Sequence, residues 1–180
     1  MTKITLPIEP ELKSLLESHC EARGLKQQHV MNAALAAYGE DPEVHMLMGL
    51  IQFAKTGAMD TATLTHFSKA LEVDPGYDQV HYVKGQCWEA VGKPGEAIAE
   101  YQAILQKDAD NAVALNNLAW TYYLVGDERA GDTARKAYER LPDNGSVADT
   151  LGWILVQYGQ PERAIDLIRK SSERKPGDPT

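Results

Sequence analysis

Small residues recur along this chain at intervals of about 34 positions, and this periodicity restricts the possible folds more than any other feature. The intervals separating Thr63, Ala97, Ala130 and Ala164 are 34, 33 and 34 residues. A repeat of this length corresponds to one pair of antiparallel helices, and a single pair cannot bury its apolar face without a neighbouring copy. The sequence therefore predicts four stacked helical hairpins, at residues 42–75, 78–111, 112–144 and 145–178.

Glycine and proline mark the ends of the predicted helices. Gly92, Gly126 and Gly159 are placed to end the first helix of a hairpin, because glycine adopts the left-handed conformation that satisfies the last free carbonyls. Pro94 and Pro161 are placed to begin the second helix, where the missing N–H needs no partner. These signals predict a short turn inside each hairpin.

Small residues also stand where the two helices of a hairpin are expected to cross, at Gly49, Gly85, Ala119 and Gly152. Ridges of one helix pack closely into the grooves of another only where the crossing side chains are small. With these anchors in register, residues 42–178 resemble the tetratricopeptide repeat family. The resemblance implies an all-α fold, an α-solenoid of four helical hairpins whose first helices line a concave, peptide-binding face.

The first forty residues break this period and start with a strand pattern. Ile4, Leu6 and Ile8 alternate with residues that are not aliphatic, which is the period of a β-strand. Two amphipathic helices are expected after the strand, on either side of Gly24. A lone strand leaves its backbone groups without an internal partner, so it either stays frayed or pairs with the strand of a second copy, and pairing is the outcome we expect. The sequence thus predicts a homodimer formed through Ile4, Leu6 and Ile8.

A strand followed by two helices within residues 1–40 resembles the ribbon-helix-helix family of dimeric DNA-binding modules. The resemblance implies that Lys3, Thr5 and Pro7 face the major groove. Proline can neither donate a hydrogen bond nor supply a cation, and the segment carries four cationic against five acidic side chains. Binding to DNA phosphates is therefore disfavoured. Two other interpretations of the segment stay open, a dimerisation module and a helical cap on the repeat stack.

The second, fifth, ninth, twelfth and thirteenth positions of each first helix are expected to face the concave surface. In the first hairpin these positions include Met46, Leu50 and Phe53. The candidate partner-binding residues from the other hairpins are Tyr82, Gln86, Asn116, Trp120, Tyr123, Asp149, Trp153 and Val156. This set has no Lys or Arg, which disfavours capture of an acidic tail and favours a peptide with apolar anchors. In the alternative interpretation, Trp120 and Trp153 pack between neighbouring repeats.

No residues combine into a catalytic or cofactor-binding motif, so we expect neither enzymatic activity nor a cofactor. His45 and His81 share the fourth position of successive hairpins without a recognised ligand spacing, so no metal site is expected. Ser146 and Asp149 lack a neighbouring histidine in the sequence and are interpreted as helix caps.

Charge and cysteine content narrow the partners and the compartment. The formal net charge of −8 disfavours a general attraction to nucleic acid or anionic lipid. No apolar run is long enough to span a membrane, and Cys20 and Cys87 are interpreted as reduced thiols of a cytoplasmic protein. The favoured function is a non-catalytic adaptor that binds a peptide segment of another protein. The alternative is a transcriptional regulator that binds DNA through residues 1–40 and senses a partner through the repeats.

Overall fold

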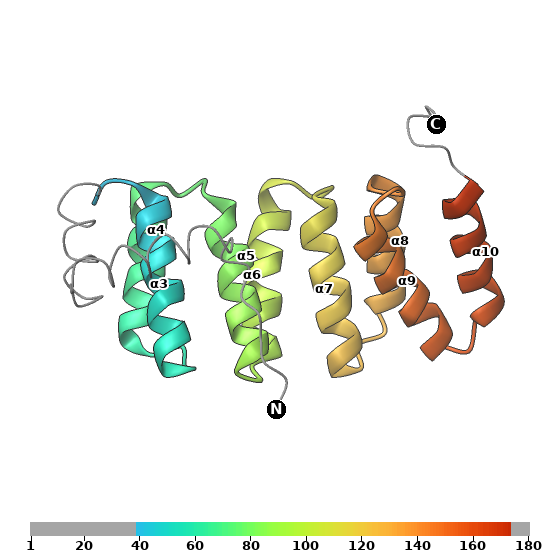
Figure 1. Ribbon diagram of the computed structural model, residues 1–180, viewed down its shortest axis with the longest axis horizontal. Helices are drawn as coiled ribbons and strands as arrows, with labels where there is room; N and C mark the ends of the chain where they lie inside the picture. Colours follow the sequence, from blue (N-terminus) through green and yellow to red (C-terminus); the bar gives the residue numbers. More distant parts are fainter. Residues whose placement is uncertain (1–38, 174–180) are drawn as a thin grey trace, which may run out of the picture. The chain divides into compact units, whose positions relative to one another are not determined.

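A computed structural model describes residues 39–173, and within this range the fold is all-α, with eight helices and no strand (Figure 1). The all-α class predicted from the sequence is therefore confirmed. The helices are α3 (Pro42–Thr56), α4 (Thr61–Val73), α5 (Asp78–Ala90), α6 (Pro94–Lys107), α7 (Ala112–Val125), α8 (Ala130–Arg140), α9 (Gly145–Gln157) and α10 (Pro161–Glu173). The predicted strand with Ile4, Leu6 and Ile8, and the resemblance to ribbon-helix-helix modules, lie outside the described residues.

The chain divides into two compact units, with the division between Val80 and His81 inside α5. The first unit contains α3 and α4, which pack against each other. The second contains the rest of α5 and the helices α6 to α10, and successive helices from α6 onward are in contact. The domain boundary predicted near residue 40 stays a prediction, because its N-terminal side is outside the described range.

The glycine signals for helix ends are confirmed by the backbone. Gly92, Gly126 and Gly159 have φ angles of 73°, 74° and 71°, in the left-handed region where a side chain is strained. Gly57 ends α3 in the same way, with a φ of 64°. The backbone N–H of Gly57 donates a hydrogen bond to the Phe53 carbonyl at 2.7 Å, which satisfies one of the free carbonyls at the end of the helix.

Asparagine side chains cap the starts of α7 and α9. The Asn111 Oδ1 atom accepts a hydrogen bond from the backbone N–H of Ala114 at 3.1 Å, and Asn144 Oδ1 accepts one from Val147 at 3.2 Å. These bonds satisfy N–H groups that the first turn of a helix leaves free. The interpretation of Ser146 and Asp149 as caps was therefore wrong, because both lie inside α9.

Two of the predicted crossings are as tight as the glycines suggest. A Cβ atom added to Gly49 would lie 2.6 Å from the Phe67 ring, and one added to Gly85 would lie 2.5 Å from the Tyr101 ring. Each aromatic ring of the second helix therefore occupies the space that a side chain on the first helix would need. At Gly152 an added Cβ would meet no described atom within 4 Å, so this crossing gives no comparable reason for glycine.

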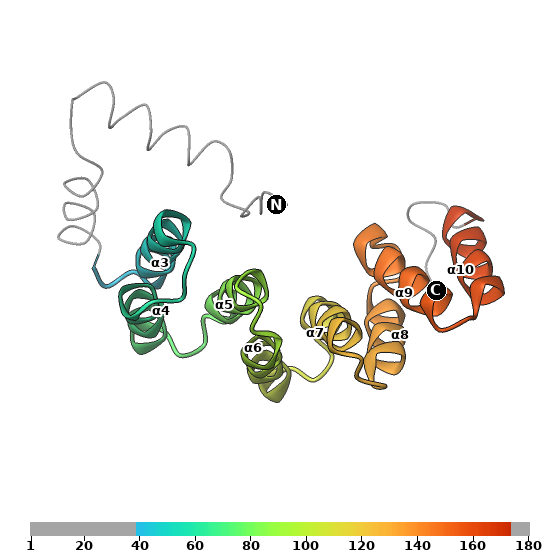
Figure 2. The same ribbon diagram turned by 90° about the horizontal axis from the view of Figure 1, so that it is seen from below.

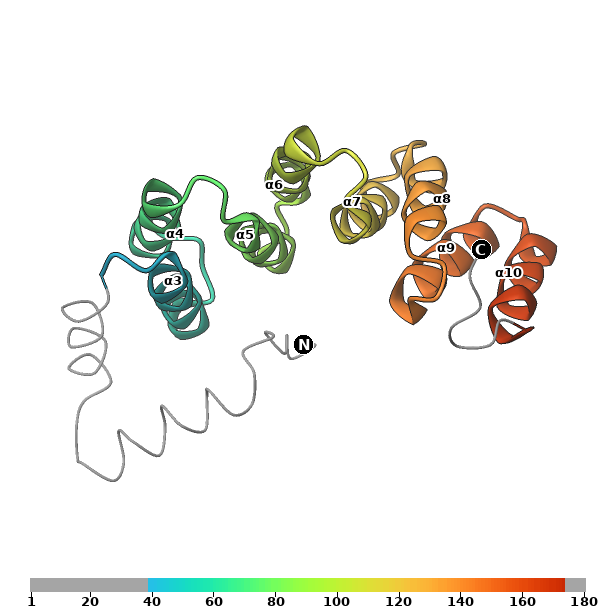
Figure 3. The ribbon, with the colours of Figure 1, turned by 90° about the horizontal axis from the view of Figure 1, so that it is seen from above.

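The core of the second unit lies between two rows of helices. Figures 2 and 3 show α5, α7 and α9 on one side and α6 and α8 on the other. Of the small residues of the 34-residue period, Ala97, Ala130 and Ala164 are buried here, as expected for positions where helices approach closely. The main cluster of buried side chains comprises Ala97, Tyr101, Leu118, Ala119, Tyr122, Ala130, Ala134, Leu151, Ile154, Leu155, Ala164 and Leu167. None of the helices between residues 42 and 173 is both long and apolar enough to cross a membrane.

Candidate functional site

The helices α7 and α9 carry matching stripes of candidate residues, which we call the α7–α9 face. On α7 the stripe is Val113, Asn116, Trp120, Tyr123 and Leu124, and on α9 it is Asp149, Trp153 and Val156. Steps of three and four residues keep each stripe on one side of its helix. Because α7 and α9 are in contact, the two stripes belong to one unit of the structure.

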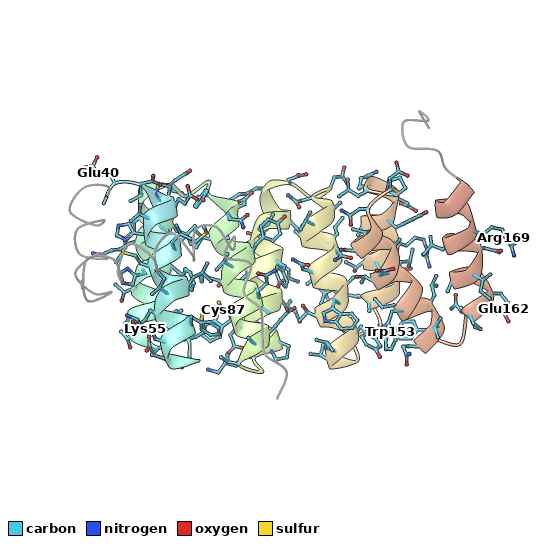
Figure 4. All side chains as sticks on the ribbon, viewed as in Figure 1. Glu40, Lys55, Cys87, Trp153, Glu162 and Arg169 are labelled. Carbon is cyan, nitrogen blue, oxygen red and sulfur yellow. The ribbon has the colours of Figure 1, made fainter. Side chains whose placement is uncertain are left out.

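Large apolar side chains on this face are open to solvent. Trp153 on α9 is 51% exposed and Val156 is 46% exposed, while Leu124 on α7 is 55% exposed (Figure 4). Water contact at several large apolar side chains costs free energy, and exposed apolar patches commonly mark interaction sites. The alternative in which Trp153 packs between repeats therefore does not describe its surroundings.

Trp120 and Tyr123 form an aromatic pair on α7. Their ring centroids are 5.5 Å apart, and the ring planes are inclined by 39°. Both side chains are partly buried, and Tyr123 packs against the main core cluster. A ring that is already held by its neighbours loses little conformational entropy when it contacts a ligand.

Asn116 supplies a polar group with no partner. Its Oδ1 atom is buried, yet no donor from residues 39–173 lies within hydrogen-bond distance of it. An unsatisfied buried acceptor lowers the stability of the fold by about 1–3 kcal/mol. A ligand N–H group that bonded to this atom would remove that cost. The sequence predicted the position of Asn116 on the face, but only the structure shows that its oxygen is unpaired.

The candidates on α5 differ from each other in their surroundings. Gln86 is exposed, whereas Tyr82 packs against the core and its hydroxyl donates a hydrogen bond to Asn111 Oδ1. Tyr82 therefore helps to hold the start of α7. Glu89, one turn after Gln86, accepts a hydrogen bond from the Thr121 hydroxyl, and its burial raises the pKa of the carboxyl above its usual range.

The corresponding positions of the first hairpin are not open. Met46, Leu50 and Phe53 on α3 are 6%, 3% and 5% exposed, although the sequence placed them on a solvent-facing surface. A helical period identifies the face on which a residue lies, but it does not identify what covers that face. Among the corresponding positions of the described hairpins, the exposed large apolar side chains are therefore on α7 and α9.

His45 and His81, which share the fourth position of successive hairpins, have different neighbours in the structure. His81 Nδ1 lies 2.8 Å from Glu100 Oε2, and Lys84 Nζ lies 2.7 Å from Glu100 Oε1. These two polar contacts join α5 to α6. Burial alone would raise the pKa of Glu100, but the hydrogen bonds from His81 and Lys84 outweigh it and lower the pKa. His45 packs instead against His66, with ring centroids 6.1 Å apart.

The described residues lack a metal-binding cluster, and their free cysteine is buried. Between residues 39 and 173, no group of three or more His, Cys, Asp or Glu side chains is placed to hold a metal ion. Cys87 is a buried free thiol, and its burial raises the pKa to about 12, which makes a reactive thiolate unfavourable at neutral pH.

Known proteins share this fold. The tetratricopeptide repeat family model matches residues 64–112. The type IV pilus assembly protein PilF of Pseudomonas aeruginosa is 30% identical over 112 residues, which cover 57% of this chain and 42% of PilF. The chain thus spans less than half of the length of that relative.

Two solved structures extend the similarity to the arrangement of the helices. MamA from Desulfovibrio magneticus RS-1 is 23% identical, with a TM-score of 0.63 and coverage of 91% of this chain and 93% of that one. PilF from Pseudomonas aeruginosa is 26% identical, with a TM-score of 0.60 and coverage of 72% of this chain and 59% of that one. The family model over residues 64–112 and the helical hairpins agree with the sequence pattern, and they confirm the resemblance of the repeats to the tetratricopeptide repeat family.

Proposed function

We propose that this protein is a non-catalytic adaptor that holds a peptide segment of a partner protein on the α7–α9 face. The observation that carries this proposal is the combination of the exposed Trp153 and Val156 with the unpaired Asn116 oxygen on adjacent helices. The apolar side chains would receive the anchors of the segment. The Asn116 side chain would turn so that its buried Oδ1 atom accepts a hydrogen bond from the backbone of the segment.

The charge of the face narrows the chemistry of the partner segment. The stripes on α7 and α9 contain Asp149 and no Lys or Arg, so an acidic peptide would find no counter-charge. The proposed segment is therefore extended or helical and carries aromatic or aliphatic anchors. Since apolar contacts are not screened by ions, binding should change little between low and high salt. Steep weakening by salt would contradict an apolar mode of binding.

Replacement of Trp120 and Trp153 together by Ala tests this proposal. Truncation of a fully buried Trp to Ala lowers the free energy of unfolding by about 3–5 kcal/mol. Because Trp153 is half exposed, its truncation should cost roughly half of that or less. We expect the double variant to keep its helical circular dichroism and to lose capture of a partner that the intact chain binds in a pull-down.

The matched control is Ile165→Ala, which removes an apolar side chain of similar exposure, 54%, from α10. This variant should bind like the wild type, because Ile165 lies outside the α7–α9 face. Unfolding of the Trp120 and Trp153 double variant, or equal loss of binding in the control, would reject the face as the binding site.

The regulator that binds DNA through residues 1–40 stays an untested alternative, and no observation on the described residues favours it. A gel-shift experiment on the full chain would detect it. A cytoplasmic location likewise stays a prediction.

A further inference from the structure

Two histidines in the first unit have ring nitrogens without partners. His45 lies in the first turns of α3 and His66 lies in the middle of α4, and their ring centroids are 6.1 Å apart with the planes inclined by 31°. The Nδ1 atoms of both rings are buried, and neither has a hydrogen-bond partner. Two such atoms in neighbouring imidazoles are unusual, because buried polar atoms are normally paired.

The other nitrogen of His45 shows which form the ring takes. Its Nε2 atom lies 3.0 Å from the backbone carbonyl oxygen of Gly39. A carbonyl oxygen can only accept, so Nε2 carries the hydrogen, and in the neutral ring the lone pair is on Nδ1. An imidazole held in this way by a backbone carbonyl is typical of histidines that bind metal ions, since the carbonyl fixes both the tautomer and the orientation of the ring.

The separation of the two rings suits one bridging ion. With a metal–nitrogen distance of about 2.1 Å, the centroid of each ring lies about 3.2 Å from the metal. Two rings on one ion are then about 6.4 Å apart when the nitrogens lie on opposite sides, and about 5.2 Å apart at the tetrahedral angle. If both Nδ1 atoms face the ion, the observed 6.1 Å corresponds to an angle of about 145° at the metal, so the rings would move closer together to reach the tetrahedral angle.

We propose that His45 and His66 bind one borderline transition-metal dication of the Zn²⁺ class through their Nδ1 atoms. The described residues supply no third His, Cys, Asp or Glu ligand, so water completes the coordination. Imidazole ligands favour Zn²⁺, Cu²⁺ and Ni²⁺ over the hard cations Mg²⁺ and Ca²⁺. The ion would join α3 to α4 at a point distinct from the α7–α9 face, and it would stabilise the first hairpin.

Titration of the full, metal-free chain with ZnCl₂ in a calorimeter tests the proposal, with MgCl₂ as the hard-cation probe. We expect one Zn²⁺ site per chain that His66→Gln abolishes, an increase in the unfolding temperature with Zn²⁺, and no response to Mg²⁺. His66→Gln is preferred to a change at His45 because His66 is only partly buried, and circular dichroism checks that the variant folds. His81→Gln is the matched control, because it removes a histidine that pairs with Glu100 in the second unit.

A further variant should act in the opposite direction. The charge of Lys69, an exposed residue on α4, acts on His66 through space and opposes the binding of a cation. Lys69→Gln should therefore tighten Zn²⁺ binding. The proposal is overturned if the wild type gives no Zn²⁺ isotherm, if His66→Gln leaves the isotherm unchanged, or if His81→Gln abolishes the site.

Discussion

The close approach of Gly85 to Tyr101 gives a prediction whose size follows from the structure. An added Cβ at Gly85 would lie 2.5 Å from Tyr101 Cε1 and 2.6 Å from Cζ, whereas ordinary contacts begin near 3.4 Å. Gly85→Ala therefore requires the ring or the helix to move by about 0.9 Å. Tyr101 is fully buried in the main core cluster, so the ring has little free volume to enter.

The expected cost is best stated as a difference between two glycines. Overpacking of this kind lowers the free energy of unfolding by about 1–3 kcal/mol, whereas the better helix propensity of alanine raises it by up to about 1 kcal/mol. Gly95 on α6 is exposed, and an added Cβ there meets nothing within 4 Å, so Gly95→Ala gains helix propensity without a clash. Gly85→Ala should therefore be less stable than Gly95→Ala by about 1–3 kcal/mol.

Urea unfolding followed by far-ultraviolet circular dichroism measures this difference. The midpoint and the slope must both be compared, because an array of repeats can lose two-state behaviour when one interface weakens. Gly49→Ala offers a second case in the first unit, where the Phe67 ring lies 2.6 Å from the added atom. Equal stabilisation of the Gly85 and Gly95 variants would refute the argument that the Tyr101 ring requires a glycine at the crossing.

Three further predictions follow from the core, the buried carboxyl and the N-terminal segment. Ala97→Leu or Ala164→Leu should lower the free energy of unfolding by about 1–3 kcal/mol and make thermal unfolding less cooperative, because both alanines are buried between helices. Unchanged melting would show that the predicted register of the second helices is wrong. Burial raises the folded-state pKa of Glu89 above its ordinary value of 4.5, so the charged carboxylate weakens the fold at neutral pH. Glu89→Gln should therefore be more stable than the wild type at pH 7. Denaturant titrations should show this advantage shrinking as the pH falls through the raised folded-state pKa, and the advantage should be gone once the pH is below 4.5. Light scattering should show a dimer for the intact chain and a monomer after deletion of residues 1–8, and a single 19.8 kDa species for the intact chain would contradict the strand-pairing argument.

The ends of the helices could be predicted from the sequence because their causes are local. Gly126 is left-handed at the end of α7, and Pro94 and Pro161 begin α6 and α10, as the residue types indicate. The cap of α9 was placed incorrectly, since Asn144, Ser146 and Asp149 all have capping side chains and lie close together in the sequence. Only the backbone geometry distinguishes the residue whose oxygen reaches a free N–H.

The periodic pattern also determined which residues share a face, because 3.6 residues per turn fix the direction of each side chain around its helix. What lies opposite a face depends on residues far away in the chain, and only the tertiary structure decided it. The position that exposes Trp153 on α9 buries Leu50 on α3. The unpaired oxygen of Asn116 and the contact of His45 with His66 were likewise invisible in the sequence, because burial and pairing are properties of packed elements and not of spacing along the chain.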